Sequence, residues 1–319
     1  MTSPLIDKKA KVFVAGHRGL VGSALMRRLS REGFLNLLTV DHSALDLTRQ
    51  TDVESFIQRE CPEYIFLAAA KVGGIYANNT FPADFITNNL HVQSNVIESA
   101  YRAGVKRMMF LGSSCIYPRL CPQPMKEEYL LSGPLEPTNM PYAVAKIAGI
   151  VMCQAFNRQY GTDFLSVMPT NLFGPGDNFH PENSHVLASL IRRFHEAKES
   201  KSEEVVVWGT GTPKREFLHV DDMADACVFL MQRGDAPDIM NIGSGQEVTI
   251  RELGELIKEV VGFKGNLRFD PSRPDGPPRK LLDSSRLNAL GWTPKITLRD
   301  GLITTYQWLL KNTSGLRAA

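Results

Sequence analysis

The chain has 319 residues, of which 43% are hydrophobic and 22% charged, and its formal net charge is +2. This size and composition predict a globular protein with a large core, and the balanced charge argues against nucleic acid as a partner. Five irregularly spaced cysteines argue against both a disulfide framework and a zinc site. The N-terminus lacks an apolar signal core and no apolar run reaches transmembrane length, so we expect a cytoplasmic protein with no membrane partner.

Apolar, strand-like segments alternate with amphipathic segments through the first half of the chain. The expected strands are residues 11–16, 37–40, 64–70, 107–113 and 164–170, and the expected helices are residues 20–31, 52–59, 88–103 and 142–160. Strands that alternate with helices predict an α/β fold of the Rossmann type, a doubly wound parallel sheet with helices on both faces.

The second half has shorter elements. The expected elements there are a helix at 186–198, a strand at 205–209, a strand and helix within 217–232, a strand at 239–243 and a proline-rich loop at 271–278. The pieces at 217–232 and 239–243 are typical of the first sheet. We therefore expect a nucleotide-binding domain in residues 1–175, joined by 216–245, and a smaller substrate-binding domain mainly in 176–319.

Three glycines mark the first expected junction between a strand and a helix. Gly16, Gly19 and Gly22 have the spacing G-x-x-G-x-x-G, which permits a tight turn and close approach to a pyrophosphate at the helix N-terminus. Arg18, inside this loop, is suited to an adenosine 2′-phosphate, as in NADP sites. Asp41, after the second strand, is the residue type that bonds the 2′-hydroxyl of NAD and repels a 2′-phosphate. The choice between NADPH and NADH therefore stays open at this point.

Tyr142 and Lys146 lie four residues apart, on one face of an expected helix. A nearby ammonium would stabilise the phenolate and lower the tyrosine pKa from its usual value of about 10, as proton transfer near neutral pH requires. The spacing alone is common in exposed pairs. Together with the glycine loop and the serines that follow the strand at 107–113, it favours a reductase site.

These features resemble the extended short-chain dehydrogenase/reductase superfamily, with Ser113, Tyr142 and Lys146 at the positions of its catalytic residues. The blocks that narrow the resemblance to the GDP-L-fucose synthases include AAAKVGGIYANNTFPADFI (68–86), LGSSCIYP (111–118), MPTNLFGPGDNFHPENSHV (168–186), VVVWGTGTPKREFLHVDDMADA (205–226) and PDGPPRKLLD (274–283). The resemblance covers almost the whole chain. It implies 3,5-epimerisation of GDP-4-keto-6-deoxy-D-mannose and NADPH-dependent reduction of its C4 ketone to give GDP-L-fucose.

The same resemblance implies that Cys115 and His185 are the acid/base pair of epimerisation. The ketone at C4 acidifies the protons at C3 and C5, and inversion requires removal of a proton from one face and its return to the other. Thiols and imidazoles both titrate close to neutral pH, so each group suits this work. Taken alone, Cys115 is more typical of a small buried core residue, and His185 and the surrounding blocks favour the acid/base role.

Further contacts follow from the resemblance. The residues expected to contact the cofactor, NADP(H) with NAD(H) as the alternative, are Gly16, His17, Arg18, Gly19, Leu20, Val21, Gly22, Asp41, His42, Leu111, Gly112, Lys146, Pro169, Thr170, Asn171, Leu172 and His185. The residues expected to contact the GDP-sugar are Arg193, Trp208, Arg215 and Asp275. A tryptophan at a strand end is more often a core residue, so Trp208 is the weakest of these. No histidine has metal-ligand spacing, so no metal is predicted. The helices at 88–103 and 142–160 are the expected surface of a homodimer.

Two other functions fit the fold. The first is a nucleotide-sugar epimerase that recycles bound NAD without net reduction, which would not need Cys115 and His185. The second is a non-catalytic protein that binds the cofactor, because fold alone does not determine function. The complete set of acid/base residues argues against both.

Overall fold

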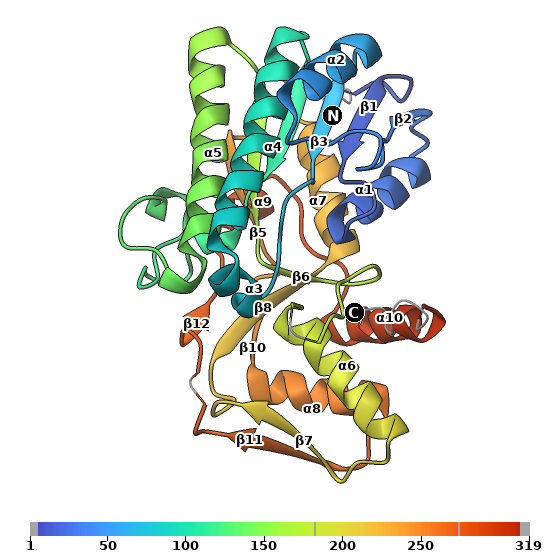
Figure 1. Ribbon diagram of the computed structural model, residues 1–319, viewed down its shortest axis with the longest axis vertical. Coiled ribbons are helices and arrows are strands. Elements are labelled where there is room, and N and C mark those ends of the chain that lie inside the picture. Colours follow the sequence, from blue (N-terminus) through green and yellow to red (C-terminus); the bar gives the residue numbers. More distant parts are fainter. Residues whose placement is uncertain (1–5, 182, 274, 313–319) are drawn as a thin grey trace.

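The computed structural model describes residues 6–181, 183–273 and 275–312. Within these residues, a parallel six-stranded sheet has the order β2-β1-β3-β4-β5-β9 (Figure 1). The strands are β1 (Lys11–Ala15), β2 (Asn36–Leu38), β3 (Tyr64–Leu67), β4 (Arg107–Leu111), β5 (Phe164–Pro169) and β9 (Ile239–Ile242). The strand order reverses direction beside β1, and the crevice at the carboxyl ends of such strands is where doubly wound sheets bind ligands.

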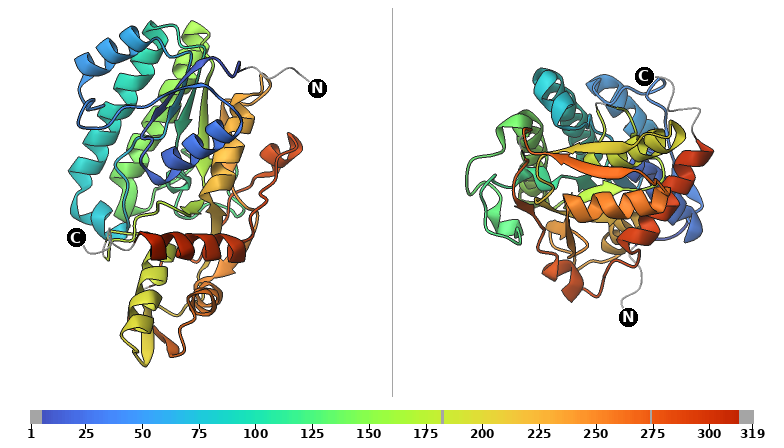
Figure 2. Two further views of the ribbon diagram at one scale, coloured as in Figure 1. Left: turned by 90° about the vertical axis from the view of Figure 1, so that its right-hand side faces the viewer. Right: turned by 90° about the horizontal axis from the view of Figure 1, so that it is seen from below.

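Helices cover both faces of this sheet, as Figure 2 shows in its left view. The helices are α1 (Leu20–Arg31) and α7 (Val220–Met231) on one face, and α2 (Gln50–Glu60), α4 (Pro82–Arg102) and α5 (Met140–Tyr160) on the other. Fully buried apolar side chains fill each interface, including Leu25 under α1 and Ile150 under α5. The predicted Rossmann-type architecture is confirmed.

The predicted elements of the first half agree with the structure within a few residues, except at the start of α4. This helix begins at Pro82 rather than residue 88 and follows a short helix, α3 (Ile75–Thr80). Pro82 occupies the first turn, where the missing N–H costs no helical hydrogen bond and the fixed φ suits a helix. A proline that reads as a helix breaker therefore begins this helix.

The strand expected at 217–219 does not join the first sheet. It is the end of β8 (Lys214–His219), which lies in a second sheet beside β6 (Asn171–Phe173), β10 (Glu247–Thr249) and β12 (Arg279–Lys280). The helix α7 that follows does pack on the first sheet, and β9 completes that sheet. The chain therefore leaves the second sheet after His219, the last residue of β8 that pairs with β6.

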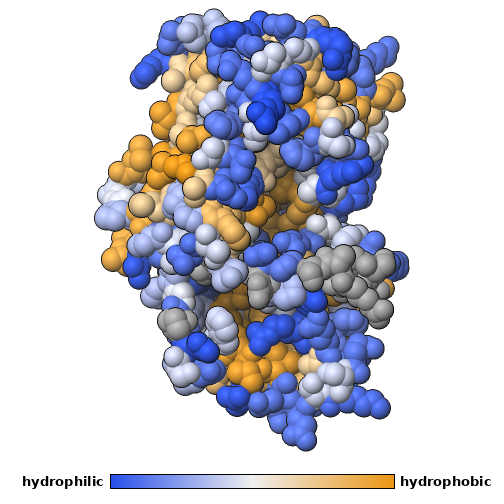
Figure 3. Space-filling model, in the orientation of Figure 1, coloured by the Kyte–Doolittle hydropathy of each residue, from blue (hydrophilic) through white to orange (hydrophobic). Residues whose placement is uncertain are grey.

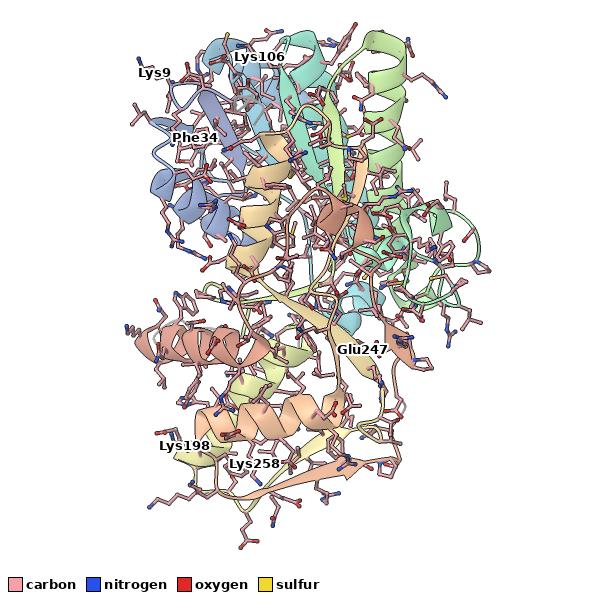
Figure 4. The ribbon with its side chains drawn as sticks, turned by 180° about the vertical axis from the view of Figure 1, so that it is seen from behind. Lys9, Phe34, Lys106, Lys198, Glu247 and Lys258 are labelled. Atoms are coloured by element: carbon pink, nitrogen blue, oxygen red, sulfur yellow. The ribbon has the colours of Figure 1, made fainter. Side chains whose placement is uncertain are left out.

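A third group of elements packs around its own apolar core. These elements are the helices α6 (Val186–Glu199), α8 (Ile250–Val261) and α10 (Leu298–Lys311), and the paired strands β7 (Glu204–Trp208) and β11 (Asn266–Asp270). The short helix α9 (Ser285–Ala289) packs instead against the first sheet, where its Leu287 is buried. Phe194 and Leu253 are buried in the core that α6, α8 and α10 enclose. Thr249 and Glu252 form a capping box at the start of α8. Figure 4 shows this part below the sheet, with Lys198 on α6 and Lys258 on α8.

Candidate active site

The glycine turn between β1 and α1 leaves room for a ligand beside its backbone. Gly16 has φ +85°, and a Cβ atom there would lie 2.7 Å from the backbone nitrogen of Ala69. A Cβ on Gly22 would lie only 2.0 Å from the carbonyl oxygen of Gly16. Both positions therefore need glycine, one for its backbone conformation and both for close packing. The N-terminus of α1, which begins at Leu20 after Gly19, is free of acidic side chains in its first turn, so the turn fits a pyrophosphate.

A cavity of about 310 Å³ opens beside this turn, between the ends of β1 and β3 and the segment after β2. Its lining includes Gly16, His42, Asp46, Thr48 and Lys71. The carboxylate of Asp46 accepts hydrogen bonds from Thr48, which lower its pKa. An enclosed cavity with apolar walls and a few polar groups suits the adenosine half of a dinucleotide.

Arg18 and Asp41, which favour opposite cofactors, form an ion pair with each other. The guanidinium nitrogen Nη2 of Arg18 lies 2.6 Å from Oδ2 of Asp41, and Nε2 of His17 lies 3.3 Å from Oδ1. Arg18 is exposed, and His17 and Asp41 are half-buried. The carboxylate therefore has cationic or polar partners on both oxygens, which reduces its repulsion of a phosphate.

The other expected cofactor residues lie where the parallel strands end. Leu111 and Gly112 close β4 and are buried, and Pro169 ends β5. The backbone nitrogen of Thr170 donates to the carbonyl of Ile242 at 3.0 Å, and Asn171 Nδ2 donates to the carbonyl of Glu216 at 2.8 Å. Leu20, Val21 and Leu172 pack partly buried against the core of the first sheet. The structure thus brings these distant residues to one edge of the sheet.

The serine and cysteine after β4 form a short 3₁₀ turn, η1 (Ser114–Ile116). The hydroxyl of Ser113 accepts a hydrogen bond from the backbone nitrogen of Cys115 at 3.2 Å, which fixes the start of the turn. Tyr142, on α5, lies next to both residues: burial and the Cys115 thiolate raise the pKa of its phenol, and hydrogen bonding with Ser113 opposes that rise. Tyr142 also meets the ring of Phe85 edge-on, at 6.2 Å between centroids.

Lys146 does not lower the pKa of Tyr142 in this structure, contrary to our expectation. Its ammonium Nζ donates to the carbonyl oxygen of Leu111 at 2.6 Å and lies 4.8 Å from the ring centre of Phe110. Burial lowers the pKa of Lys146 to about 7. The four-residue spacing places both residues on one helix face, but it does not determine which partner the long lysine side chain reaches.

Lys280, which the sequence analysis did not single out, contacts the proposed acid/base cysteine. Its Nζ lies 3.3 Å from Sγ of Cys115, across 165 residues of sequence. Burial alone would raise the pKa of this thiol, but the charge of Lys280 and hydrogen bonds from Ser113 and Lys280 outweigh it, so the pKa of Cys115 is lowered. The only earlier signal was its place in the block PDGPPRKLLD.

His185 lies at the N-cap position of α6. Its side chain keeps exposed surface although protein surrounds it on several sides. Desolvation lowers the pKa of its imidazole, and the charge of Lys280 lowers it further. The charge of Lys280 therefore acts on both Cys115 and His185, and Cys115 in turn lies beside Ser113 and Tyr142.

The chain is similar to known proteins over almost its whole length. The NAD dependent epimerase/dehydratase family matches residues 12–243. GDP-L-fucose synthase 1 of Arabidopsis thaliana is 67% identical over 97% of this chain and 96% of its own length, and GDP-L-fucose synthase of Escherichia coli K12 is 54% identical over 97% and 99%. The crystal structure of a GDP-L-fucose synthetase from Naegleria fowleri bound to NADP superposes with a TM-score of 0.93, at 28% identity, over 99% of this chain and 98% of that one. This chain belongs to the GDP-L-fucose synthase family.

The expected substrate residues of this family member lie on the second part of the chain, around β7, β8 and the loop after β11. Trp208 is 66% exposed, with the guanidinium of Arg273 5.2 Å from its ring centre. Nη1 of Arg215 donates to the carbonyl of Pro277 at 2.7 Å. The tryptophan is therefore a surface residue and not part of the core.

Two other substrate residues are held by hydrogen bonds. The carboxylate of Asp275 accepts from the backbone nitrogen of Thr210 at 3.0 Å and from its hydroxyl at 2.7 Å. Arg193, on α6, donates from Nη2 to the carbonyl of Val206. These contacts tie α6 and the loop after β11 to β7 and the turn that follows it.

Metal and membrane sites were also considered. Among the described residues, no group of three or more His, Cys, Asp or Glu side chains is arranged to hold a metal ion. Over the same part of the chain, no helix is long and apolar enough to span a bilayer.

Proposed function

We propose that this chain catalyses both steps of GDP-L-fucose synthesis, epimerisation at C3 and C5 and NADPH-dependent reduction at C4 of GDP-4-keto-6-deoxy-D-mannose. The observation that carries this proposal is the proximity of Cys115 to Tyr142 and Ser113 at the end of β4, with His185 at the start of α6. A reductase needs only the serine, tyrosine and lysine. A thiol in direct electrostatic contact with the phenol adds a group that can move protons at carbon.

Epimerisation needs two groups on opposite faces of the sugar ring. Either Cys115 or His185 takes the proton from the carbon next to the ketone, and the other returns a proton to the opposite face. Hydrogen bonding of the forming enolate by Ser113 and Tyr142 would stabilise the negative charge on the C4 oxygen. Both residues lie beside Cys115, so one oxyanion site serves both carbons.

Reduction uses the same ketone. NADPH, when bound, supplies the hydride that C4 accepts. The raised pKa of Tyr142 keeps its phenol protonated at neutral pH, ready to donate a proton to the alkoxide oxygen while Ser113 holds that oxygen. Lys146, buried beside Leu111, is the residue that would contact the nicotinamide ribose.

The proposed cofactor is NADP(H), with NAD(H) as the alternative. Arg18 can meet a 2′-phosphate from its exposed position, and its pairing with Asp41 reduces the negative charge at that site. The crystal structure with NADP bound is of a relative at 28% identity. Direct comparison of NADPH and NADH is therefore part of the test of function.

The test follows reduced-nicotinamide absorbance when purified protein meets GDP-4-keto-6-deoxy-D-mannose with NADPH or NADH. Stoichiometric oxidation with GDP-L-fucose as product supports both steps. Oxidation that yields an unepimerised GDP-6-deoxy sugar would remove the epimerisation roles of Cys115 and His185. Turnover of a nucleotide sugar without net oxidation would favour an NAD-recycling epimerase, and cofactor binding without any turnover would favour a non-catalytic protein.

We further propose a homodimer that forms through α4 and α5. Apolar side chains such as Val144 and Val151 are exposed on α5, and Figure 3 shows apolar surface along the edge of the molecule where α5 lies. A light-scattering mass of one 35.5 kDa chain would contradict this.

We propose a cytoplasmic location because the five cysteines are free. We also propose a domain division at about residue 175, which limited proteolysis would test.

A further inference from the structure

We propose that Lys280 is a positioning residue for Cys115. The ammonium of Lys280 stabilises the thiolate form of Cys115 during epimerisation. This inference rests on the proposed function of Cys115. The contact that carries it is the 3.3 Å separation between Nζ of Lys280 and Sγ of Cys115. Cys115 is partly buried and lies beside Ser113 and Tyr142, so the pair belongs to the site proposed for the reacting carbons.

Both partners are held in place by the backbone around them. The backbone of Lys280, in β12, is paired in parallel with that of Arg215 in β8. The next residue, Leu281, donates its N–H to the side chain of Gln123 at 2.9 Å. Leu282 N–H donates to the buried carboxylate of Glu216 at 3.0 Å. Two separate segments, β8 and the loop that contains Gln123, therefore fix the strand that carries the ammonium.

The thiol is fixed from the other side of the site. Its backbone nitrogen donates to the Ser113 hydroxyl, and the 3₁₀ turn that contains it follows buried β4 directly. The titratable groups that face this pair are Tyr142 on α5, which carries no charge at neutral pH because its pKa is raised, His185 at the start of α6, and Cys121, whose pKa burial raises and the charge of Lys280 lowers in part. The charge of Lys280 thus lowers the pKa of both Cys115 and His185.

Either direction of proton transfer passes through the thiolate. If Cys115 takes the proton from the ring carbon, it begins as the thiolate and ends as the thiol. If it returns the proton to the carbon, it begins as the thiol and ends as the thiolate. His185 takes the opposite part, and both groups then exchange protons with water. A fixed ammonium next to sulfur lowers the free energy of the charged form in both cases.

Lys280 could also have a different role, in binding the substrate, and the experiment must distinguish that role from stabilisation of the Cys115 thiolate. Lys280 follows the loop that carries Asp275, and its backbone is paired with that of Arg215 in β8. Its ammonium could therefore instead bind the diphosphate of GDP. That function would change the KM for the substrate and leave the reactivity of Cys115 in the free enzyme unchanged.

The experiment measures alkylation of Cys115 by iodoacetamide as a function of pH, with peptide-level mass spectrometry to separate the five cysteines. We would compare wild type with Lys280→Met, Lys280→Arg and the neighbouring control Arg279→Gln. Arg279 pairs at the surface with Glu247, labelled in Figure 4, at 2.7 Å between Nε and Oε2. Cys61, which is exposed at the end of α2, is the internal reference.

We expect Lys280→Met to move the Cys115 profile to higher pH and to slow alkylation at pH 7 on the order of tenfold, because an opposite charge this close stabilises the thiolate. Lys280→Arg should restore part of the reactivity, and Arg279→Gln should leave it unchanged. Deuterium exchange at C3 and C5 of the keto-sugar, measured in D₂O without cofactor, should fall in parallel with alkylation.

An unchanged alkylation profile in folded Lys280→Met would overturn the proposal, whatever happens to turnover. If that variant does not fold, Lys280→Gln takes its place, because the neutral amide also removes the charge, and an unchanged Cys115 profile in that variant would overturn the proposal in the same way. Alkylation needs no substrate, so its outcome is independent of whether wild type converts the keto-sugar, which tests the proposed function separately.

Discussion

The ammonium of Lys146 donates a hydrogen bond to the carbonyl oxygen of Leu111 at 2.6 Å, at the end of the central strand β4. This contact ties α5 to the sheet edge next to Ser113. It also buries a cation whose pKa falls to about 7 as a result. Folding therefore opposes protonation of this lysine at neutral pH.

Replacement of Lys146 by Met should change stability in a pH-dependent way. The folded-state pKa lies below the unfolded value of about 10.4, so the unfolded state binds more protons between the two values and wild type loses stability as pH falls through that window. Lys146→Met should therefore have a larger unfolding free energy than wild type. This difference should be greater at pH 7 than at pH 9.5, by roughly 3 kcal/mol. Urea unfolding at both pH values measures this, and equal differences would show that the lysine is not desolvated.

The two reactions should separate by mutation. Tyr142→Phe removes the proton donor for the C4 alkoxide, so NADPH oxidation should fall by about 10²–10⁴-fold. Deuterium exchange at C3 and C5 should fall much less, because Ser113 still stabilises the enolate and Cys115 and His185 are intact. Cys115→Ser should show the reverse, with exchange lost and an unepimerised sugar as the reduced product. Equal loss of both activities in both variants would indicate that the residues act as one unit.

Asp41 should limit the preference for NADPH over NADH. Its carboxylate lies 2.6 Å from the guanidinium of Arg18, so Asp41→Ala frees the arginine for a 2′-phosphate and removes a negative charge. We expect the ratio of the NADH and NADPH dissociation constants, measured by nucleotide fluorescence, to increase about tenfold. Arg18→Ala should decrease that ratio. No change in either variant would place the adenosine ribose elsewhere.

Trp208 should matter for substrate and not for stability. Because the side chain is 66% exposed, Trp208→Ala should change the unfolding free energy by no more than about 0.5 kcal/mol. The KM for the GDP-sugar should rise several-fold while kcat changes little. The matched control is Trp292, which is buried and donates to Asp225 at 2.8 Å; its replacement by Ala should cost about 3–5 kcal/mol of stability.

Gly22 and Gly19 should respond differently to alanine. A Cβ on Gly22 would clash with the Gly16 carbonyl at 2.0 Å, whereas a Cβ on Gly19 would lie 3.4 Å from the same oxygen. Gly22→Ala should therefore destabilise the fold by about 2 kcal/mol or more, and Gly19→Ala should keep the melting temperature within a few degrees. If Gly19→Ala also leaves the cofactor dissociation constant unchanged, the pyrophosphate does not approach this turn.

Local sequence determined much of this protein. The apolar run before Gly16 and the amphipathic period after Gly19 predicted α1 at residues 20–31, where the structure places it. Strand alternation with helices predicted the parallel sheet, and therefore the edge at which Leu111, Gly112 and Thr170 meet. These features follow from neighbours along the chain, because side-chain periodicity and glycine geometry act over a few residues.

Only the tertiary structure decided the partners of these residues. The contact of Lys280 with Cys115, the pairing of Arg18 with Asp41 and the place of β8 in the second sheet join segments 165, 23 and about 40 residues apart. The ammonium of Lys146 donates to the Leu111 carbonyl rather than contacting Tyr142, and the side chain of Trp208 lies at the surface. Long-range pairing and burial determine such choices, and they depend on the whole packed chain rather than on spacing within any one segment.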